Sequence, residues 1–436
     1  MISVIESRGM ASSRFWSMSR PRAGALRWPS RHFPHLALTA TTLAALLYIA
    51  CTRAPSPCGS QSPALNAALL SYPPHGPGVS SQNATFEHFK RRSEDDLRRA
   101  AALLASWPEN KPKAAYFVLA RQADLQGVIQ SVGDLEARFN RKARYPYIFV
   151  NDAEFGDDFM AEVEALTDAP VFFGGVPAEQ WGLPAHVDRV EAETAWRRMG
   201  AAGVLYGGSE SYRHMCRYFS GFFMNHPLLR GFDYYWRVEP NVRFYCSLQR
   251  DPFAVMRDSG ASYGWNIILT EIMETIPSLW ATSIEFLHSA PSLLAAQPGI
   301  KAFASRFRLG SSLEETLAES RYNGCHFWSN FEIGRLDFLR GDAYQRYFQH
   351  LDSSGGFFME RWGDAPVHSI AAMLFLNKTE IHQFEDIGYT HDIHTHCPQS
   401  RELNQHCSCN PEADVNAHGY CMRYYKRQVL GEGSKA

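Results

Sequence analysis

The setting of Glu239 is the clearest sign of chemistry in this sequence. Glu239 lies in the stretch YYWRVEPNVRFYC, positions 234–246, directly before Pro240. Aromatic and β-branched residues favour a buried strand and proline ends it, so we expect Glu239 at the carboxyl end of a strand. Open α/β sheets bind ligands at that end, and a carboxylate fixed there can hold a divalent cation against a diphosphate. The alternative is an ordinary ion pair with Arg237 or Arg243.

Two further carboxylates, Glu332 and Asp364, are candidates for catalytic work. Glu332 lies within the aromatic run HFWSNFEI, so we expect partial burial and a raised pKa unless a cation is near. Its structural alternative is a salt bridge to Arg335 or Arg340. Asp364 follows Trp-Gly in a loop and precedes a helix predicted over 367–375, so its alternative is a helix N-cap.

We expect no catalytic role for three basic side chains near these carboxylates in the sequence. Arg237 and Arg361 can neutralise phosphate, although exposed ion pairing is the default for surface arginines. His368, just inside the helix predicted over 367–375, is expected to be a packing or acceptor-site residue rather than a catalyst.

The chain beyond position 386 is unusually rich in histidine and cysteine. On spacing alone this segment could be read as a zinc site, but in an oxidising compartment the cysteines would sooner form disulfides. Seven cysteines follow position 200, and an odd number leaves one free. Which cysteines pair cannot be deduced from the sequence. The residues concerned are His391, His394, His396, Cys397, His406, Cys407 and Cys409.

The elements that must position these residues read as an α/β fold. Strands are predicted over 114–120 and 147–150 with a helix over 124–139 between them, which makes a βαβ unit. A third strand is predicted over 171–174, and the strand over 233–238 delivers Glu239. Further helices are predicted over 211–224, 265–276, 311–318 and 335–350.

The N-terminal part divides into three segments. Residues 1–35 are rich in arginine, 36–51 are almost entirely apolar, and 52–85 are rich in proline, serine and glycine. We read them as a cytosolic basic tail, an uncleaved signal-anchor helix and a stem. A cleaved signal peptide is the competing interpretation of 36–51. Sequons at Asn83 and Asn377 fit a secretory lumen. Residues 86–436 are long enough for one large domain or two small ones, and we expect a single large catalytic domain.

Composition excludes one class of partner. The 436 residues carry a formal net charge of -2 and 45% hydrophobic residues. Such a chain has material for a large core, but it lacks the basic surface that nucleic acid or an anionic membrane surface would need.

Several long motifs together resemble one family. The segments SYRHMCRYFSGFF, YYWRVEPNVRFYC, HFWSNFEIGRLDF and ERWGDAPVHSIAA, with LARQADL and ARFNRKARYPYIFVNDAEF before them, are similar to the fungal Golgi α-1,2-mannosyltransferases, glycosyltransferase family fifteen. The resemblance covers residues 114–425 with the motifs in order. It departs at 247–249 and 263–266, which puts the choice of acceptor in question.

The resemblance implies a GT-A-like, mostly parallel sheet flanked by helices, and a type II Golgi membrane protein with its catalytic domain in the lumen. It implies transfer of mannose from GDP-mannose, with Mn2+ and with retention, to mannose of glycoprotein N- or O-glycans. A retaining glycosidase built on Glu332 and Asp364, or a catalytically silent mannose-binding protein, are the alternatives. The implied roles are metal ligand for Glu239 and His391, nucleophile or stabiliser for Glu332, base for Asp364, and substrate contact for Tyr212, Arg237 and Glu271. Glu271 is the weaker of these candidates, and we expect it to be an exposed carboxylate on a helix.

Overall fold

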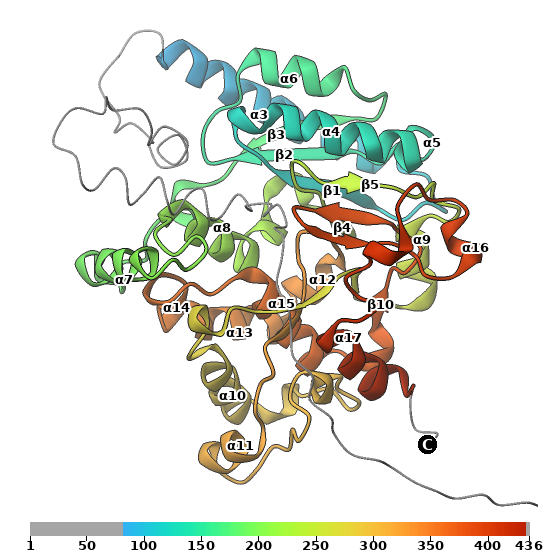
Figure 1. Ribbon diagram of the computed structural model, residues 1–436. Helices are drawn as coiled ribbons and strands as arrows, with labels where there is room; N and C mark the ends of the chain where they lie inside the picture. The colour runs from blue at the N-terminus through green and yellow to red at the C-terminus, as the bar shows by residue number, and fades with distance from the viewer. Residues whose placement is uncertain (1–81, 433–436) are drawn as a thin grey trace, which may run out of the picture. The chain divides into compact units, whose positions relative to one another are not determined.

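The core of the computed structural model is a seven-stranded mixed sheet in the order β10-β6-β9-β4-β1-β2-β3 (Figure 1). Only β9 runs antiparallel to its neighbours β4 and β6; the other pairs are parallel. The structure describes residues 82–432. The strands are β1 Ala114–Leu119, β2 Tyr147–Asn151, β3 Val171–Gly175, β4 Tyr234–Arg237, β6 Tyr263–Trp265, β9 Glu332–Arg335 and β10 Ile381–Gln383.

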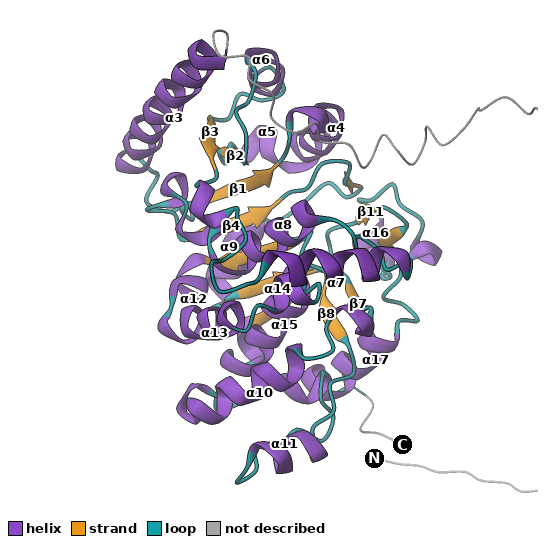
Figure 2. Cartoon of the chain, turned by 90° about the vertical axis from the view of Figure 1, so that its left-hand side faces the viewer, coloured by secondary structure: helices purple, strands orange, loops and turns teal. Residues whose placement is uncertain are grey.

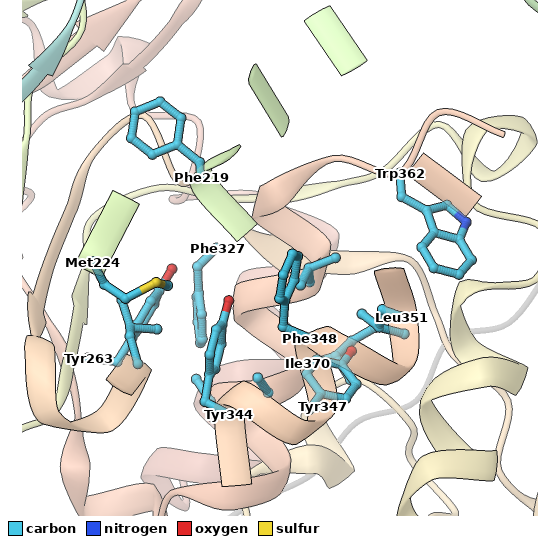
Figure 3. Packing of buried hydrophobic residues seen from close by; sticks show 14 of the residues in the cluster. Phe219, Met224, Tyr263, Phe327, Tyr344, Tyr347, Phe348, Leu351, Trp362 and Ile370 are labelled. Carbon is cyan, nitrogen blue, oxygen red and sulfur yellow. The ribbon is translucent and has the colours of Figure 1, made fainter. Parts of the chain in front are cut away.

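Helices cover both faces of this sheet, so its strands are buried on both sides. Along β1, Ala115 and Phe117 belong to one core cluster, whereas Tyr116 and Val118 belong to the other, as the period of two of a strand requires. The second cluster includes α4 (Leu125–Leu135) and α6 (Asp157–Glu164). The first includes α8 (Glu210–Gly221), α13 (Asp342–Ser353) and α15 (Asp364–Phe375) (Figures 1 and 2). Figure 3 shows the aromatic packing of this first cluster.

Two small sheets join distant parts of the chain. A three-stranded sheet pairs β5 (Arg243–Phe244) with β11 (Tyr389–His391), which in turn pairs with β12 (His394–His396). A two-stranded sheet joins β7 (Ile268–Thr270) to β8 (Cys325–Phe327). Because β5 closely follows Glu239, the first small sheet carries the C-terminal segment towards the end of β4.

Two disulfides tie the C-terminal segment to the body, and a third lies within that segment. They join Cys246 to Cys407, Cys325 to Cys421 and Cys397 to Cys409, and Cys216 is free and buried. The expectation of one unpaired cysteine among the seven is confirmed. The cysteine-rich tail is therefore a disulfide segment and not a zinc site.

One predicted helix is wrong and another is interrupted. The segment over 265–276 is the end of β6, then β7 and a short 3-10 turn, Met273–Thr275, because β7 pairs with a strand from a distant part of the chain. The segment over 335–350 is two helices, α12 (Leu336–Arg340) and α13, separated by Gly341. The other predicted elements are confirmed to within a few residues, including α11 (Leu313–Glu319).

The described residues begin with α3 (Gln82–Ala105). No helix among residues 82–432 is long and apolar enough to cross a membrane. The anchor predicted over 36–51, with the basic tail and nearly all of the stem, lies outside the described residues.

Candidate functional site

Arg237 is the central charge of the site, between two of the predicted carboxylates. Its Nε donates to Glu239 Oε1 at 2.7 Å and its Nη1 donates to Asp364. The guanidinium carbon lies 3.5 Å from the centre of the Phe219 ring. Burial would lower the pKa of Arg237, but Asp364, Glu239 and Glu332 together raise it. The expected exposed ion pair is wrong, since only 4% of Arg237 is exposed.

Asp364 opens α15 but does not cap it. The N-cap residue is Gly363, and the Asp364 carboxylate instead accepts from Arg237 and from Ser329 Oγ, the latter at 2.6 Å. Burial would raise the pKa of Asp364, but Arg237 and His368 lower it below the usual value. The N-cap alternative is therefore wrong, and Asp364 is a buried anion facing the sheet.

Glu332 is fully buried and held by hydroxyl and imidazole groups. It accepts from the hydroxyl groups of Tyr235 and Tyr263, the latter at 2.6 Å, and His368 Nδ1 lies 2.7 Å away. Burial would raise the pKa of Glu332, but His368 lowers it. The raised pKa expected for Glu332 in the absence of a cation is therefore not found, because His368 is near. The alternative of a salt bridge to arginine is wrong, because Arg335 pairs with Asp337 and Arg340 donates to backbone carbonyls.

The two predicted metal ligands lie on elements that the small sheet brings together. Glu239 lies two residues beyond the end of β4, at its carboxyl end as expected, with 23% of its side chain exposed. His391 ends β11, and its Nδ1 lies 2.8 Å from the side-chain amide of Asn330. Tyr389, two residues before His391, donates to both oxygens of Asn330 at 3.1 Å. Burial and the charge of Glu239 raise the pKa of Tyr389, so Glu239 is within electrostatic reach of this group.

Tyr212 and Glu271 are both in contact with Arg361. The Arg361 guanidinium carbon is 5.2 Å from the centre of the Tyr212 ring, and Nη2 is 3.5 Å from Glu271 Oε1. Arg361 is buried, and its Nε lacks a hydrogen-bond partner within the described chain. Glu271 precedes a 3-10 turn and accepts from the backbone N–H of Ile272 at 2.8 Å. The expected exposed helix carboxylate at Glu271 is therefore wrong.

The segment between β8 and β9 links these groups. Ser329 bonds Asp364, Asn330 bonds His391, and Glu332 begins β9. Sequence reasoning missed Ser329 and Asn330, although both stand in the motif that contains Glu332. The available signal was two adjacent polar residues, Ser329 and Asn330, in an otherwise aromatic run.

The cation site is not a ready-made cluster. Among residues 82–432, the one group of three or more close ligand atoms from His, Cys, Asp or Glu is Cys246, Cys407 and Cys409, which are engaged in disulfides. Glu239 and His391 therefore do not belong to a cluster of three or more close protein ligands among the described residues. A cation there needs further ligands from a substrate or water.

A large cavity of about 890 Å³ lies elsewhere, at the amino ends of β1 and β4. Three of the cations that line it already have partners. Lys111 donates to the carbonyl of Ala143, Arg257 pairs with Asp258, and Arg335 pairs with Asp337. This cavity lies at the opposite end of β4 from Glu239 and contains none of the predicted site residues.

Comparison with known proteins gives consistent likenesses. Residues 77–429 match the family described as glycolipid 2-alpha-mannosyltransferase. Over 323 residues the chain is 44% identical to Glycolipid 2-alpha-mannosyltransferase 1 of Candida albicans, covering 72% of each protein. Over 313 residues it is 42% identical to O-glycoside alpha-1,2-mannosyltransferase omh1 of Schizosaccharomyces pombe, covering 72% of this chain and 77% of the relative.

Two solved structures share the fold. The Mn/GDP form of core-mannan synthase A (CmsA/Ktr4) from Aspergillus fumigatus matches with a TM-score of 0.68 and 38% identity, covering 74% of this chain and 87% of that one. The mannosyltransferase Ktr4p of Saccharomyces cerevisiae in complex with GDP matches with a TM-score of 0.68 and 31% identity, covering 81% and 98%. The expected GT-A-like architecture is confirmed.

Proposed function

We propose that this chain, which belongs to the glycolipid 2-alpha-mannosyltransferase family, transfers mannose from GDP-mannose to a mannose hydroxyl of glycoprotein glycans. The transfer forms an α-1,2 linkage and retains the configuration of the donor. Relatives act on O-glycosides or glycolipids by name, and the acceptor class proposed for this chain is mannosylated N- or O-glycans. No relative reported above is a glycosidase or a lectin, so those alternatives have no support.

The observation that carries the proposal is the convergence of the predicted residues on Arg237 and on the segment before β9. Arg237 joins Glu239 to Asp364, and Ser329 and Asn330 join Asp364 and His391 to the same segment. Residues far apart in the chain therefore meet where β4 ends, which is the ligand end of an α/β sheet.

Mn2+ is the cofactor that this donor set fits. One carboxylate oxygen and one imidazole nitrogen suit Mn2+, and the missing ligands would come from a diphosphate and water. Glu239 and His391 would hold the ion, which when bound neutralises charge on the departing nucleoside diphosphate.

Asn330 decides which nitrogen of His391 is free. As a donor to Nδ1, the Asn330 amide leaves the hydrogen on Nε2. With its amide group reversed, Asn330 would accept from Nδ1–H, and Nε2 would be free to bind a cation. Tyr389 could still donate to the backbone oxygen of Asn330 in that arrangement.

The remaining residues have roles that follow from their charge and position. Arg237 is permanently charged and keeps Asp364 as a partner when a cation engages Glu239. Asp364 is an ionised, buried carboxylate, and we assign it the proton of the acceptor hydroxyl. Tyr212, whose ring stacks on that of Tyr206 at 4.5 Å, would contact the donor nucleotide. Glu271 with Arg361 would offer hydrogen bonds to sugar hydroxyls.

The compartment we propose is the Golgi lumen. Three disulfides suit an oxidising environment. Residues 36–51 would anchor the chain as a single-pass type II membrane protein, with 1–35 in the cytosol.

One assay tests the proposal. The purified full chain is incubated with GDP-mannose, Mn2+ and a panel of mannosides, and the linkage of the product is determined. We expect an α-1,2-linked product, formed only with donor and metal and abolished by a chelator. Release of free mannose from α-mannosides without donor would instead favour the glycosidase.

A further inference from the structure

His368 and Glu332 form a fully buried pair between α15 and the central sheet. His368 Nδ1 lies 2.7 Å from Glu332 Oε2, and Nε2 lies 2.9 Å from the carbonyl oxygen of Phe219 on α8. A carbonyl oxygen can only accept, so Nε2 carries a hydrogen, and a carboxylate facing Nδ1 favours a second hydrogen there. Both ring nitrogens then donate, which makes His368 an imidazolium.

The surroundings favour this charged state. Burial would lower the pKa of His368, but Glu332 outweighs it and raises the pKa above the ordinary value. The Phe223 and Tyr344 rings lie 6.3 Å and 5.8 Å from the His368 ring, between centroids, and Tyr344 belongs to the aromatic packing shown in Figure 3. Water is therefore excluded from the pair, and the imidazolium is the nearest positive group in direct contact with Glu332.

Glu332 is held from three elements at once. Oε1 accepts from Tyr235 on β4, and Oε2 accepts from Tyr263 on β6 and from His368 on α15. Arg237 stands opposite Glu332 in the β4–β9 ladder. The other titratable groups that act on the pair are Asp364 on α15 and Tyr344 on α13.

We propose that His368 is a positioning residue that holds Glu332 as an immobile anion, which serves the transfer through its charge. This inference rests on the proposed mannosyl transfer. A carboxylate whose two oxygens accept three hydrogen bonds is a poor nucleophile. Its negative charge still stabilises the positive charge that develops on the sugar ring in the transition state. Only an ionised Glu332 can do this.

The pH dependence of turnover tests the role. His368→Asn keeps a neutral amide near the Nδ1 position and removes the positive charge. Glu332 would then be a buried carboxylate without its cation, and its pKa would rise. We expect the acid limb of the kcat profile to move to higher pH by at least about one unit, with KM for GDP-mannose within about threefold. A lower plateau with an unmoved acid limb would show a packing role alone and overturn the proposal.

His226→Asn is the matched control. His226 is also a buried histidine whose Nε2 meets a backbone carbonyl, that of Gly175, but it does not contact Glu332. We expect this variant to lose stability while its acid limb stays where the wild type has it.

A second measurement does not depend on activity. The histidine rings of the labelled full chain are titrated by NMR, and the His368 signal is identified by its loss in His368→Asn. We expect an imidazolium that persists above the ordinary histidine range and is lost in Glu332→Gln. A neutral His368 at a pH of about 6 would overturn the proposal. A persistent imidazolium in an enzyme that makes no mannoside would support the buried pair and refute the proposed transfer.

Discussion

Arg237 and Glu332 stand opposite each other in the antiparallel ladder between β4 and β9, and residues so placed leave the same face of a sheet. A cation and an anion thus point together towards α15. There Arg237 meets Asp364, and Glu332 meets His368, one helical turn further on. The site is consequently a set of opposite charges paired between one helix and two strands.

The first prediction concerns Glu239, the carboxylate proposed to bind Mn2+. Glu239→Ala should weaken Mn2+ binding in the presence of GDP by more than about 100-fold, since loss of an outer partner alone costs about 10–100-fold. The fold should survive, because Arg237 keeps Asp364. Free Mn2+ measured by electron paramagnetic resonance checks this. Asp386→Ala is the control, because Asp386 is similarly exposed, 24% against 23%, and pairs with Arg250. Unchanged Mn2+ affinity in Glu239→Ala would refute the assignment.

The second prediction concerns Asn330, which orients His391. Asn330→Ala should weaken Mn2+ binding by about 10–100-fold, because the imidazole loses the group that fixes its orientation and tautomer. The same resonance titration measures it. Asn416 is also buried and hydrogen-bonded, so Asn416→Ala should lower stability and leave the affinity for Mn2+ unchanged. Equal affinities for Mn2+ in Asn330→Ala and the wild type would show that Asn330 has no role in metal binding.

How much the sequence could predict is clearest at β4. Aromatic residues followed by proline are a local signal, and Glu239 does follow the end of this strand. The helix wrongly predicted over 265–276 shows where local signals fail. Its residues form β7 only because β8, from much further along the chain, pairs with them, and such a partner leaves no trace in a local pattern.

The sequence was enough to predict which residues form the site, but not which of them contact one another. That Glu332 meets His368 and not Arg335 depends on how α15 packs on the sheet. That His391 approaches the end of β4 depends on the pairing of β11 with β5. Both are tertiary relationships, so the sequence could supply candidates for them but not their geometry.

The third prediction concerns Asp364 and has a kinetic and a pH component. Asp364→Asn should lower kcat by about 10²–10⁴-fold, because the acceptor hydroxyl loses its base, and leave KM for GDP-mannose within about threefold.

Because the pKa of Asp364 is lowered in the fold, its charge stabilises the protein above the unfolded value of about 3.9, and this contribution disappears as the pH falls through the folded value. The gap in unfolding free energy between wild type and variant should therefore narrow below a pH of about 4.

Asp352→Asn is the control for the third prediction. Asp352 pairs with the buried Arg217 at 2.7 Å and 2.8 Å, outside the site. This variant should lose stability and keep its kcat. Near-normal turnover in Asp364→Asn would remove Asp364 from the chemistry.

The fourth prediction concerns the kind of help Glu332 gives. Glu332→Gln should bind GDP-mannose normally and turn over at least about 100-fold more slowly. Wild-type protein given donor without acceptor should show no mass increase of one hexose unit by intact mass spectrometry, because the carboxylate is held by three donors. A hexose attached to Glu332 would establish a covalent intermediate.

The Cys246–Cys407 disulfide links the segment after β5 to the chain that follows β11, which carries the proposed metal ligand His391. Glu239 follows a strand of the central sheet. β11, which carries His391, pairs with β5 over only two residues, and the disulfide lies two residues beyond the end of β5. In a chain synthesised in a reducing cytosol, the imidazole would lose its covalent tether while the carboxylate kept its place. We therefore expect protein made in a reducing host to bind Mn2+ more weakly than protein made in an oxidising one.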